Sequence, residues 1–318
     1  MKKLSGIVSF LFLAMSASFA DSSSSSSAPN PSWQPNSMIV FGDGYSDNGN
    51  AYRANHSHFP ESPPYWHGRY SNGPVWAEIL ASNAQFTGDP TTNPDQTNSK
   101  LFHDYARGDS VILKTDESQR KTTTLDQQIA QYSSEKSAHS ATAVAIFWDG
   151  ANDLMVSPCY QKPFLCVDGL VKDLKKNILT VYGTGVKHFV VISAPNVSLS
   201  PSIRKNNDPA TQTDIADLVR YYNHNLALLA YQLGQQHKDA DFLFIESQPI
   251  FDNIAEGYGL QTSAPCYDNE GSGTPCIKTD KGFFYWDNFY PTVNVHSEFA
   301  SEISKRMYFD DQNDSDES

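Results

Sequence analysis

The sequence predicts an α/β fold of three layers, with helices on both faces of a parallel sheet. Short runs of apolar and β-branched residues lie at residues 38–41, 143–148, 188–192 and 241–245. Each run has the length of a buried strand. Longer stretches with helical patterns separate them, and strands that alternate with helices form right-handed βαβ units. This alternation predicts parallel strands with helices packed on both sides.

Four helices are expected around these strands. The first begins at Trp76, shortly after Pro74, and the second covers residues 125–132. Apolar residues recur at helical spacing over residues 167–181 and over residues 211–233, the longest stretch. A stripe of apolar residues at this spacing indicates a helix with one face against the core.

Residues 1–20 have the three parts of a secretory signal peptide. Lys2 and Lys3 precede an apolar run from Leu4 to Met15, and small residues end at Ala20. The apolar run is shorter than the roughly 20 residues that a transmembrane helix needs. We therefore expect cleavage after Ala20 and a secreted or periplasmic protein.

Two segments of biased composition flank the predicted domain. Residues 21–36 are rich in serine and proline, which is typical of a flexible linker. Residues 309–318 are mostly acidic and polar, which predicts a disordered tail. Because no internal repeat or second linker appears between them, residues 37–308 are expected to form a single domain.

The chain is acidic, with a formal net charge of −13 at pH 7. Such a surface repels the phosphate backbone of nucleic acids, so nucleic acid is excluded as a partner class. We interpret the charge as favouring solubility rather than a specific basic partner.

Four cysteines form two local pairs, Cys159 with Cys166 and Cys266 with Cys276. An even number of cysteines in an exported protein indicates disulfides. Three pairings are formally possible, and the local one closes the shortest loops. Neither pair has the spacing of a zinc site and no histidine cluster accompanies them, so no metal is expected.

Glycines and aspartates follow two of the predicted strands. Gly42, Asp43 and Gly44 come directly after the first strand, and Asp149 and Gly150 come after the second. In parallel sheets ligands bind beyond the carboxyl ends of the strands. The predicted fold therefore brings these residues to the expected site.

Residues 41–50, FGDGYSDNGN, resemble the first block of the GDSL, or SGNH, hydrolases, which reads close to FGDSLSDxGN. In that family the serine after Gly-Asp is the nucleophile. Gly44 stands in its place, and glycine has no atom with which to attack an ester. Loss of the nucleophile is the first sign of an inactive family member.

The resemblance extends from Ser37 to about Met307. Residues 63–76, PPYWHGRYSNGPVW, are similar to the second block of the secreted bacterial branch of lecithinases, phospholipases and glycerophospholipid-cholesterol acyltransferase-like proteins. This resemblance implies the SGNH hydrolase fold, a three-layer sandwich with a flavodoxin-like parallel sheet. It also implies an activity on lipid acyl esters that needs no cofactor.

The family's oxyanion donors map onto Gly73 and Asn152. Gly73 stands in the second block and Asn152 in the sequence GAND after a predicted strand. A backbone N–H and an amide NH₂ are suitable donors to a developing alkoxide. In the alternative interpretation, Asn152 and Asp153 cap a helix or close a turn. The neighbouring blocks favour the oxyanion role.

The last block of the family reads close to DxxHPTxxxH, with the first histidine as base and the aspartate as its orienting carboxylate. Here residues 287–296 read DNFYPTVNVH, so Asp287 matches the orienting position and Tyr290 replaces the base. A phenol with a pKa near about 10 stays protonated at neutral pH and cannot take a proton from an alcohol. The nucleophile and the base are therefore both absent.

Two other residues are possible substitutes. Ser46 lies two positions after Gly44, and His296 matches the second histidine of the family's last block. Both types of residue also occur in the family as background. Ser46 attacks only if the turn changes its register, and a hydrogen-bonded structural role is the simpler interpretation of His296.

Three hypotheses for function follow. The first is an inactive lipase-like homologue that retains an acyl-lipid pocket and binds lipid or acyl-ester ligands, with possible contact to a membrane surface. The second is an active esterase or phospholipase that uses a rearranged nucleophile such as Ser46. The third is a non-catalytic scaffold for another protein. Resemblance and the two substitutions favour the first.

Overall fold

The computed structural model describes residues 35–86, 100–113, 123–135, 141–155, 159, 163–271, 273–276 and 282–307. The predicted signal peptide, nearly all of the predicted linker and the predicted acidic tail lie outside these residues. Their boundaries, and those of the single domain between them, stay predictions. Among the described residues, no helix is both long enough and apolar enough to cross a membrane.

The described strands form one parallel sheet in the order β2-β1-β3-β4-β5. The strands are β1 (Ser37–Gly42), β2 (Leu101–Asp104), β3 (Ala143–Trp148), β4 (His188–Ile192) and β5 (Asp241–Ile245). This is the flavodoxin-like order, in which the chain changes direction across the sheet between β1 and β3. The predicted fold class is confirmed.

Strands β1 and β3 are apolar except for Ser37 and Gly42 at the ends of β1. Every residue of β1 and β3 is buried, as expected for strands covered on both faces. Full burial stabilises each Ile, Val or Phe side chain by about 1.5–3 kcal/mol relative to exposure. The edge strand β2 was not predicted from the sequence, because Leu101–Asp104 is too short and too polar to show a pattern.

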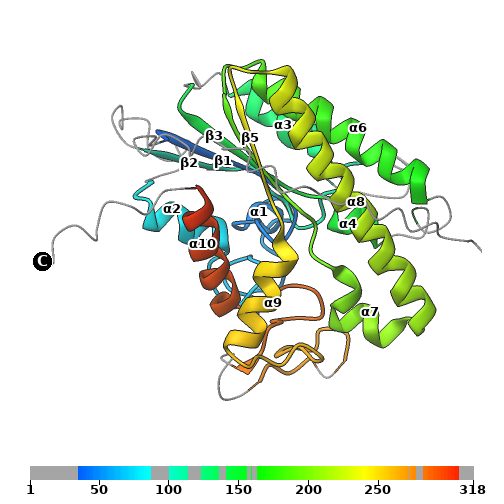
Figure 1. Ribbon diagram of the computed structural model, residues 1–318. Coiled ribbons are helices and arrows are strands. Elements are labelled where there is room, and N and C mark those ends of the chain that lie inside the picture. The colour runs from blue at the N-terminus through cyan, green and yellow to red at the C-terminus, as the bar shows by residue number, and fades with distance from the viewer. Residues whose placement is uncertain are drawn as a thin grey trace, which may run out of the picture. The chain divides into compact units, whose positions relative to one another are not determined.

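The longer helices form the outer layers. They are α2 (Trp76–Asn83), α3 (Leu125–Ser134), α6 (Pro163–Tyr182), α8 (Pro209–Gln236), α9 (Ser247–Gly257) and α10 (Val293–Met307). Helices α3, α6 and α8 cover one face of the sheet, and α2, α9 and α10 lie on the other (Figure 1). The three-layer sandwich expected from the sequence is therefore present.

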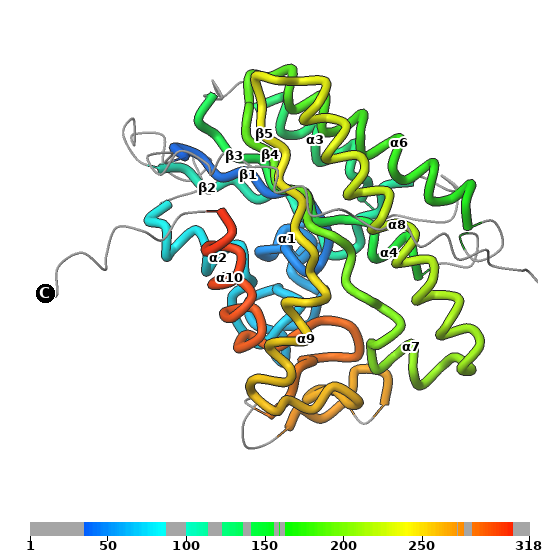
Figure 2. Tube along the Cα trace, in the orientation of Figure 1, coloured from blue at the N-terminus to red at the C-terminus, as the bar shows by residue number. Residues whose placement is uncertain are grey.

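Shorter helices lie in the connections at the carboxyl ends of the strands. They are α1 (Asn50–Ala54), α4 (Ala151–Leu154), the 3₁₀ helix η1 (Val197–Leu199) and α7 (Pro201–Asn206). The segment between α9 and α10 lies against α9 and α7, as the orange part of Figure 2 shows. The Ser202 N–H of α7 donates to the Asn288 carbonyl of this segment at 3.1 Å.

Local sequence explains where the predicted helices begin. The Thr124 side chain accepts from the Gln127 N–H, and the Gln127 side chain accepts from the Thr124 N–H, which forms a capping box before α3. Asp208 accepts from the Thr211 N–H at 2.8 Å, and Pro209 takes the first position of α8. Helix α8 therefore begins at Pro209, two residues before the predicted start.

Both predicted disulfides are present. Cys159 pairs with Cys166 and Cys266 pairs with Cys276, so all four cysteines are oxidised. The local pairing expected from the spacing is confirmed.

Candidate active site

Adjacent strands β1 and β3 bring the two motif segments together. Gly42 is in register with Trp148, so the residues after them lie side by side at the carboxyl edge of the sheet. A Cβ atom on Gly42 would lie 2.2 Å from the Trp148 carbonyl oxygen, which explains the glycine. This edge, at the change of direction between β1 and β3, is where ligands bind in such sheets.

The turn after β1 is held by its two aspartates. The Asp43 carbonyl accepts from the Ser46 and Asp47 N–H groups, and its carboxylate accepts from the Tyr45 N–H at 3.0 Å. Asp47 accepts from four backbone N–H groups, including that of Gly108 at 2.8 Å. Gly44 is thus fixed in a rigid turn.

Tyr290 occupies the space beside Gly44. A Cβ atom built on Gly44 would lie 2.5 Å from Tyr290 Cζ and 2.6 Å from its hydroxyl oxygen. Such separations are shorter than real Cβ contacts, so the phenol fills the volume that a serine side chain would need. The structure therefore brings the predicted nucleophile and base positions into direct contact.

The phenol is enclosed and protonated. Its ring packs against Tyr45 and Tyr70, each with a centroid separation of 5.1 Å, and its hydroxyl donates to the Gly108 carbonyl at 3.2 Å. Burial, followed by the negative charge of Asp43, holds the pKa of Tyr290 well above its usual value. Tyr290 cannot serve as a general base.

Asp287, at the predicted position of the orienting carboxylate, is buried and hydrogen-bonded to its own loop and to Tyr65. Its Oδ1 atom accepts from the backbone N–H groups of Phe289 and Tyr290, and its Oδ2 atom accepts from the Tyr65 hydroxyl at 2.7 Å. Burial raises its pKa to about 6, against the opposing effect of these hydrogen bonds. It orients the loop, because no imidazole is present at residue 290.

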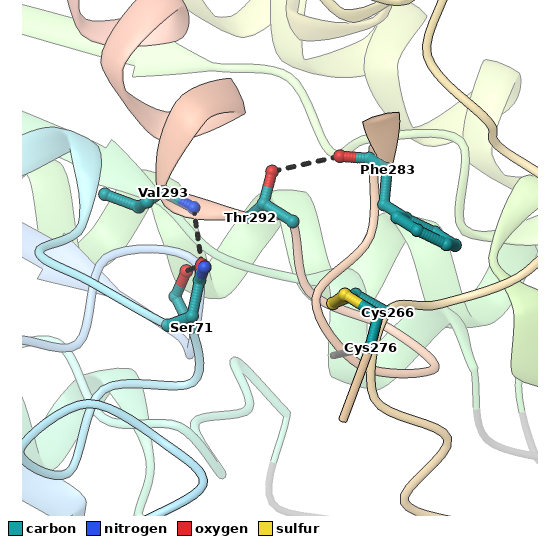
Figure 3. The surroundings of a disulfide bond; sticks show 7 residues. Ser71, Cys266, Cys276, Phe283, Thr292 and Val293 are labelled. Atoms are coloured by element: carbon teal, nitrogen blue, oxygen red, sulfur yellow. Dashed lines mark hydrogen bonds between the residues drawn. A yellow bond between two sulfur atoms is a disulfide. The ribbon is translucent and has the colours of Figure 1, made fainter. Parts of the chain in front are cut away.

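Two motif segments far apart in the sequence are joined at this loop. The Ser71 hydroxyl donates to the Pro291 carbonyl at 2.9 Å, and Asn72 Oδ1 accepts from the Val293 N–H at 2.8 Å. The Thr292 hydroxyl donates to the Phe283 carbonyl at 3.1 Å (Figure 3). The second and last blocks therefore form one hydrogen-bonded unit.

Gly73 lies in the same unit. A Cβ atom at Gly73 would come within 2.5 Å of Val293 Cγ2. The glycine therefore permits the close approach between the two segments, besides its expected role as an oxyanion donor.

The Asn152 amide, on α4, already has acceptors. Its Nδ2 atom donates to the Ser110 carbonyl at 2.8 Å and to the Gly108 carbonyl at 3.3 Å. Gly108 O thus accepts from both Asn152 and Tyr290, which places the Tyr290 hydroxyl next to the predicted oxyanion donor. Asp153 accepts from the Ile112 and Leu113 N–H groups. The Asn152 and Asp153 side chains therefore both hydrogen-bond to the backbone of residues 108–113, which follow β2.

Ser46 and His296 do not form a dyad. Ser46 is fully buried and accepts from the Trp76 indole N–H at 3.1 Å, while His296 Nδ1 accepts from the Trp76 backbone N–H at 3.3 Å. His296 Nε2 has no hydrogen-bond partner among the described residues. Burial lowers the His296 pKa to about 3, so the ring is neutral. Both side chains are parts of the core beside the site.

A cavity of about 440 Å³ opens next to Tyr45. Its walls come from the loop after β4, from α7 and α9, and from Leu260, Thr262, Phe284 and Tyr285. The lining residues after β4 were not predicted from the sequence, because they are scattered over separate elements and share no motif. Among the described residues, no cluster of His, Cys, Asp and Glu has the arrangement of a metal site.

The Gly-Asp, Gly-Ala-Asn-Asp and Asp-x-x-x-Pro-Thr segments follow one another along the chain in the order of the motifs that the sequence resembles. The chain belongs to the GDSL-like Lipase/Acylhydrolase family, whose model matches residues 38–303. The resemblance found in the sequence is thereby confirmed.

Several curated proteins are similar. The phosphatidylcholine-sterol acyltransferase of Aeromonas hydrophila is 26% identical over 62% of this chain and 55% of its own length. The secreted effector protein SseJ of Salmonella typhimurium is 24% identical over 83% of this chain and 61% of its own. An Arabidopsis thaliana relative named inactive GDSL esterase/lipase-like protein 25 is 24% identical, over 75% of this chain and 62% of its own. The chain thus spans 55–62% of the length of these three relatives.

Proposed function

We propose that this protein is a secreted member of the GDSL family that has lost ester hydrolysis and binds lipid or acyl-ester ligands without cleaving them. The observation that carries the proposal is the position of Tyr290. Its ring fills the volume of a serine side chain at residue 44, and its hydroxyl shares the Gly108 carbonyl with Asn152.

Three features of the site support the loss of ester hydrolysis. A serine esterase needs a nucleophile, a base that takes its proton and donors free to meet the oxyanion. Gly44 supplies no nucleophile, Tyr290 stays protonated, and the Asn152 amide is engaged. In serine hydrolases, loss of the nucleophile alone lowers turnover by about 10⁶.

The burial of Ser46 argues against a rearranged active site. A nucleophile must reach the substrate, yet Ser46 has no exposed surface and its hydroxyl accepts from Trp76. His296, the candidate base, hydrogen-bonds to Trp76 rather than to Ser46. An active form would require the turn after β1 and the packing of Trp76 to change together.

The partners and location follow from the same proposal. The names of the relatives, among them an acyltransferase that acts on phosphatidylcholine and a secreted effector, support a lipid ligand and export. The two disulfides favour an oxidising compartment, either periplasmic or extracellular. The proposal includes contact with a membrane surface, because a membrane is the source of a lipid ligand.

The test is to restore the missing groups. Hydrolysis of a short p-nitrophenyl ester and of a lysophospholipid is measured for the mature protein and for Gly44→Ser, Tyr290→His and the double variant. We expect activity only in the double variant. Gly44→Ser alone forces a side chain against Tyr290, and Tyr290→His alone supplies a base without a nucleophile.

Thermal melts establish that each variant is folded before its activity is compared. Multiple turnovers by the unaltered protein, abolished by Ser46→Ala, would overturn the proposal. They would show that the family's chemistry has moved to a second serine.

A further inference from the structure

The cavity beside Tyr45 has the size of a small-ligand site. Its volume of about 440 Å³ lies within the range of about 300–1,000 Å³ that is typical of such sites. Tyr45 belongs both to the cavity wall and to the group of rings around Tyr290. The cavity therefore adjoins the altered nucleophile position without including it.

Much of the wall is apolar. The rings of Phe251 and Phe284 pack edge to face with a centroid separation of 5.3 Å. The ring centroids of Tyr45 and Phe251 are 6.5 Å apart. Leu199 and Leu260 are half-buried and line the same space. A hydrocarbon chain against these groups gains the free energy of apolar burial.

Arg204 is the only cation that lines the cavity among the described residues. It lies on α7 and is half-buried, and its Nη1 atom donates to the Thr262 carbonyl at 3.5 Å. No carboxylate of the described chain forms an ion pair with it. A guanidinium offers five donors in a planar fork that matches a carboxylate or a phosphate.

Two carboxylates also line the cavity, but they are more exposed. Asp252 and Glu256 are open to solvent, and Asp252 accepts from Gln248 Nε2 at 2.7 Å. Water and salt screen exposed charges more than half-buried ones. The Tyr285 pKa, which burial raises, is lowered by Arg204 and raised to a smaller extent by Asp252. At Tyr285 the positive charge of Arg204 therefore has a larger effect than the negative charge of Asp252.

We propose that the cavity binds a single-chain amphiphile with an anionic head group. Arg204 holds the carboxylate or phosphate, and the chain lies against Tyr45, Phe251 and Phe284. This inference rests on the proposed function, because it names the ligand that the inactive protein retains.

The experiment measures binding by calorimetry below the critical micelle concentration. Dodecanoate and lauroyl lysophosphatidate present the two anionic heads, while dodecyl maltoside and dodecyltrimethylammonium present neutral and cationic heads on a chain of the same length. We expect both anions to bind more tightly than the other two. The anion that binds more tightly shows which ligand the cavity prefers: dodecanoate indicates a free fatty acid, and lauroyl lysophosphatidate indicates a lysophospholipid.

Arg204→Gln removes the charge and retains much of the side-chain length. It should weaken binding of both anions by about tenfold to a hundredfold, the effect of a charge-assisted hydrogen bond. Arg220→Gln is the matched control, because Arg220 is exposed on α8 and pairs with Asp217. It should bind as the unaltered protein does. Ala255→Trp, a neutral change on the cavity wall, should abolish binding.

Equal binding of neutral and anionic probes, or unchanged binding by Arg204→Gln, would overturn the inference. So would tighter binding of the cationic probe, because Asp252 and Glu256 would then determine the ligand. Absence of anion binding in a protein that is also inert as an esterase would overturn this inference alone. Ester turnover would overturn the proposed function whatever the binding data.

Discussion

The side chain of Tyr290 explains why residue 44 is glycine. The φ angle of Gly44 lies outside the left-handed region, so the backbone conformation itself accepts any residue. The three atoms nearest to the point that a Cβ atom would occupy all belong to the phenol, the first at 2.5 Å, so this ring excludes a larger side chain. Residues 44 and 290 therefore constrain each other, because the tyrosine ring occupies the space that a side chain at residue 44 would need.

This coupling predicts a non-additive effect on stability. Gly44→Ala should lower the free energy of unfolding by about 1–3 kcal/mol, the usual cost of overpacking. In a Tyr290→Ala background the same change should cost little, because the opposing ring is absent. Urea denaturation of the four proteins measures the difference.

Gly234→Ala serves as the control for that cycle. Gly234 lies inside α8, and an added Cβ meets nothing within 4 Å. Alanine there should stabilise the protein by up to about 1 kcal/mol, because a helix interior disfavours glycine. An equal cost of Gly44→Ala in both backgrounds would contradict the role given to Tyr290.

Among the elements, the segment closed by Cys266 and Cys276 supports the altered site. Asn269 Nδ2 donates to the Tyr65 hydroxyl at 3.1 Å, and Tyr65 in turn donates to Asp287. Asn288 Nδ2 donates to Asn269 Oδ1 at 2.8 Å. The disulfide-bonded segment therefore fixes the loop that carries Asp287 and Tyr290.

Removing this disulfide should loosen that loop. We expect Cys266→Ser/Cys276→Ser to lose about 2–3 kcal/mol of stability, as for other loops of this length. Trp286 is buried in one cluster with Tyr65 and Cys266, so its indole should become more accessible to acrylamide quenching. The change should vanish when Trp286 is replaced by Phe.

Cys159→Ser/Cys166→Ser is the matched control, since that bridge lies at the start of α6 and not in the cluster of Trp286. It should lower stability without the increase in Trp286 quenching. Similar quenching in both double variants would show that the disulfide between Cys266 and Cys276 does not specifically fix the loop that carries Asp287 and Tyr290.

Strong apolar patterns predicted most of the elements, and weaker patterns left others unpredicted. Four strands and four helices follow from apolar runs and helical spacing, and the structure contains each of them. Helix α10 was not predicted, because its residues were interpreted only as a motif. Its buried residues recur every four positions, a signal that was present in the sequence: Val295, Phe299, Ile303 and Met307.

Across the whole molecule, buried carboxyl groups at the sheet edge make stability depend on pH. Burial and the nearby charge of Asp149 raise the Asp43 pKa well above its usual value. Burial, with the same neighbour, raises the Asp153 pKa to about 8. Each folded-state pKa exceeds the unfolded value of about 3.9, so the native state binds more protons.

Stability should therefore fall as the pH rises from about 4 to about 8. A group with a raised folded pKa contributes fully below its unfolded pKa, and the contribution is lost as pH rises through the folded value. Thermal melts at pH 5.5, 6.5, 7.5 and 8.5 should show a steady decrease in Tm. Asp43→Asn, which retains an oxygen that accepts from the Tyr45 N–H, should make the decrease smaller.

Asp208→Asn provides the comparison. Asp208 is exposed, and its hydrogen bond from the Thr211 N–H lowers its pKa, so its contribution is lost only at acid pH. The variant should keep the slope of Tm against pH seen in the unaltered protein above pH 5.5. A slope near zero in the unaltered protein would show that the carboxylates at the sheet edge are fully ionised in the native state.

The order of residues was enough to predict the family, the layered fold and the disulfide pairing, and it places Gly44 and Tyr290 where the resembled motifs have serine and histidine. These follow from local patterns: apolar periodicity, turn residues and the content and spacing of motifs. The positions of the substituting side chains emerge only when the chain is folded. Gly44 and Tyr290 are 246 positions apart in the sequence, and their contact depends on packing between β1 and the loop before α10. The position of Arg204 in the cavity wall also depends on the folded structure, because the lining residues come from separate elements and share no sequence motif.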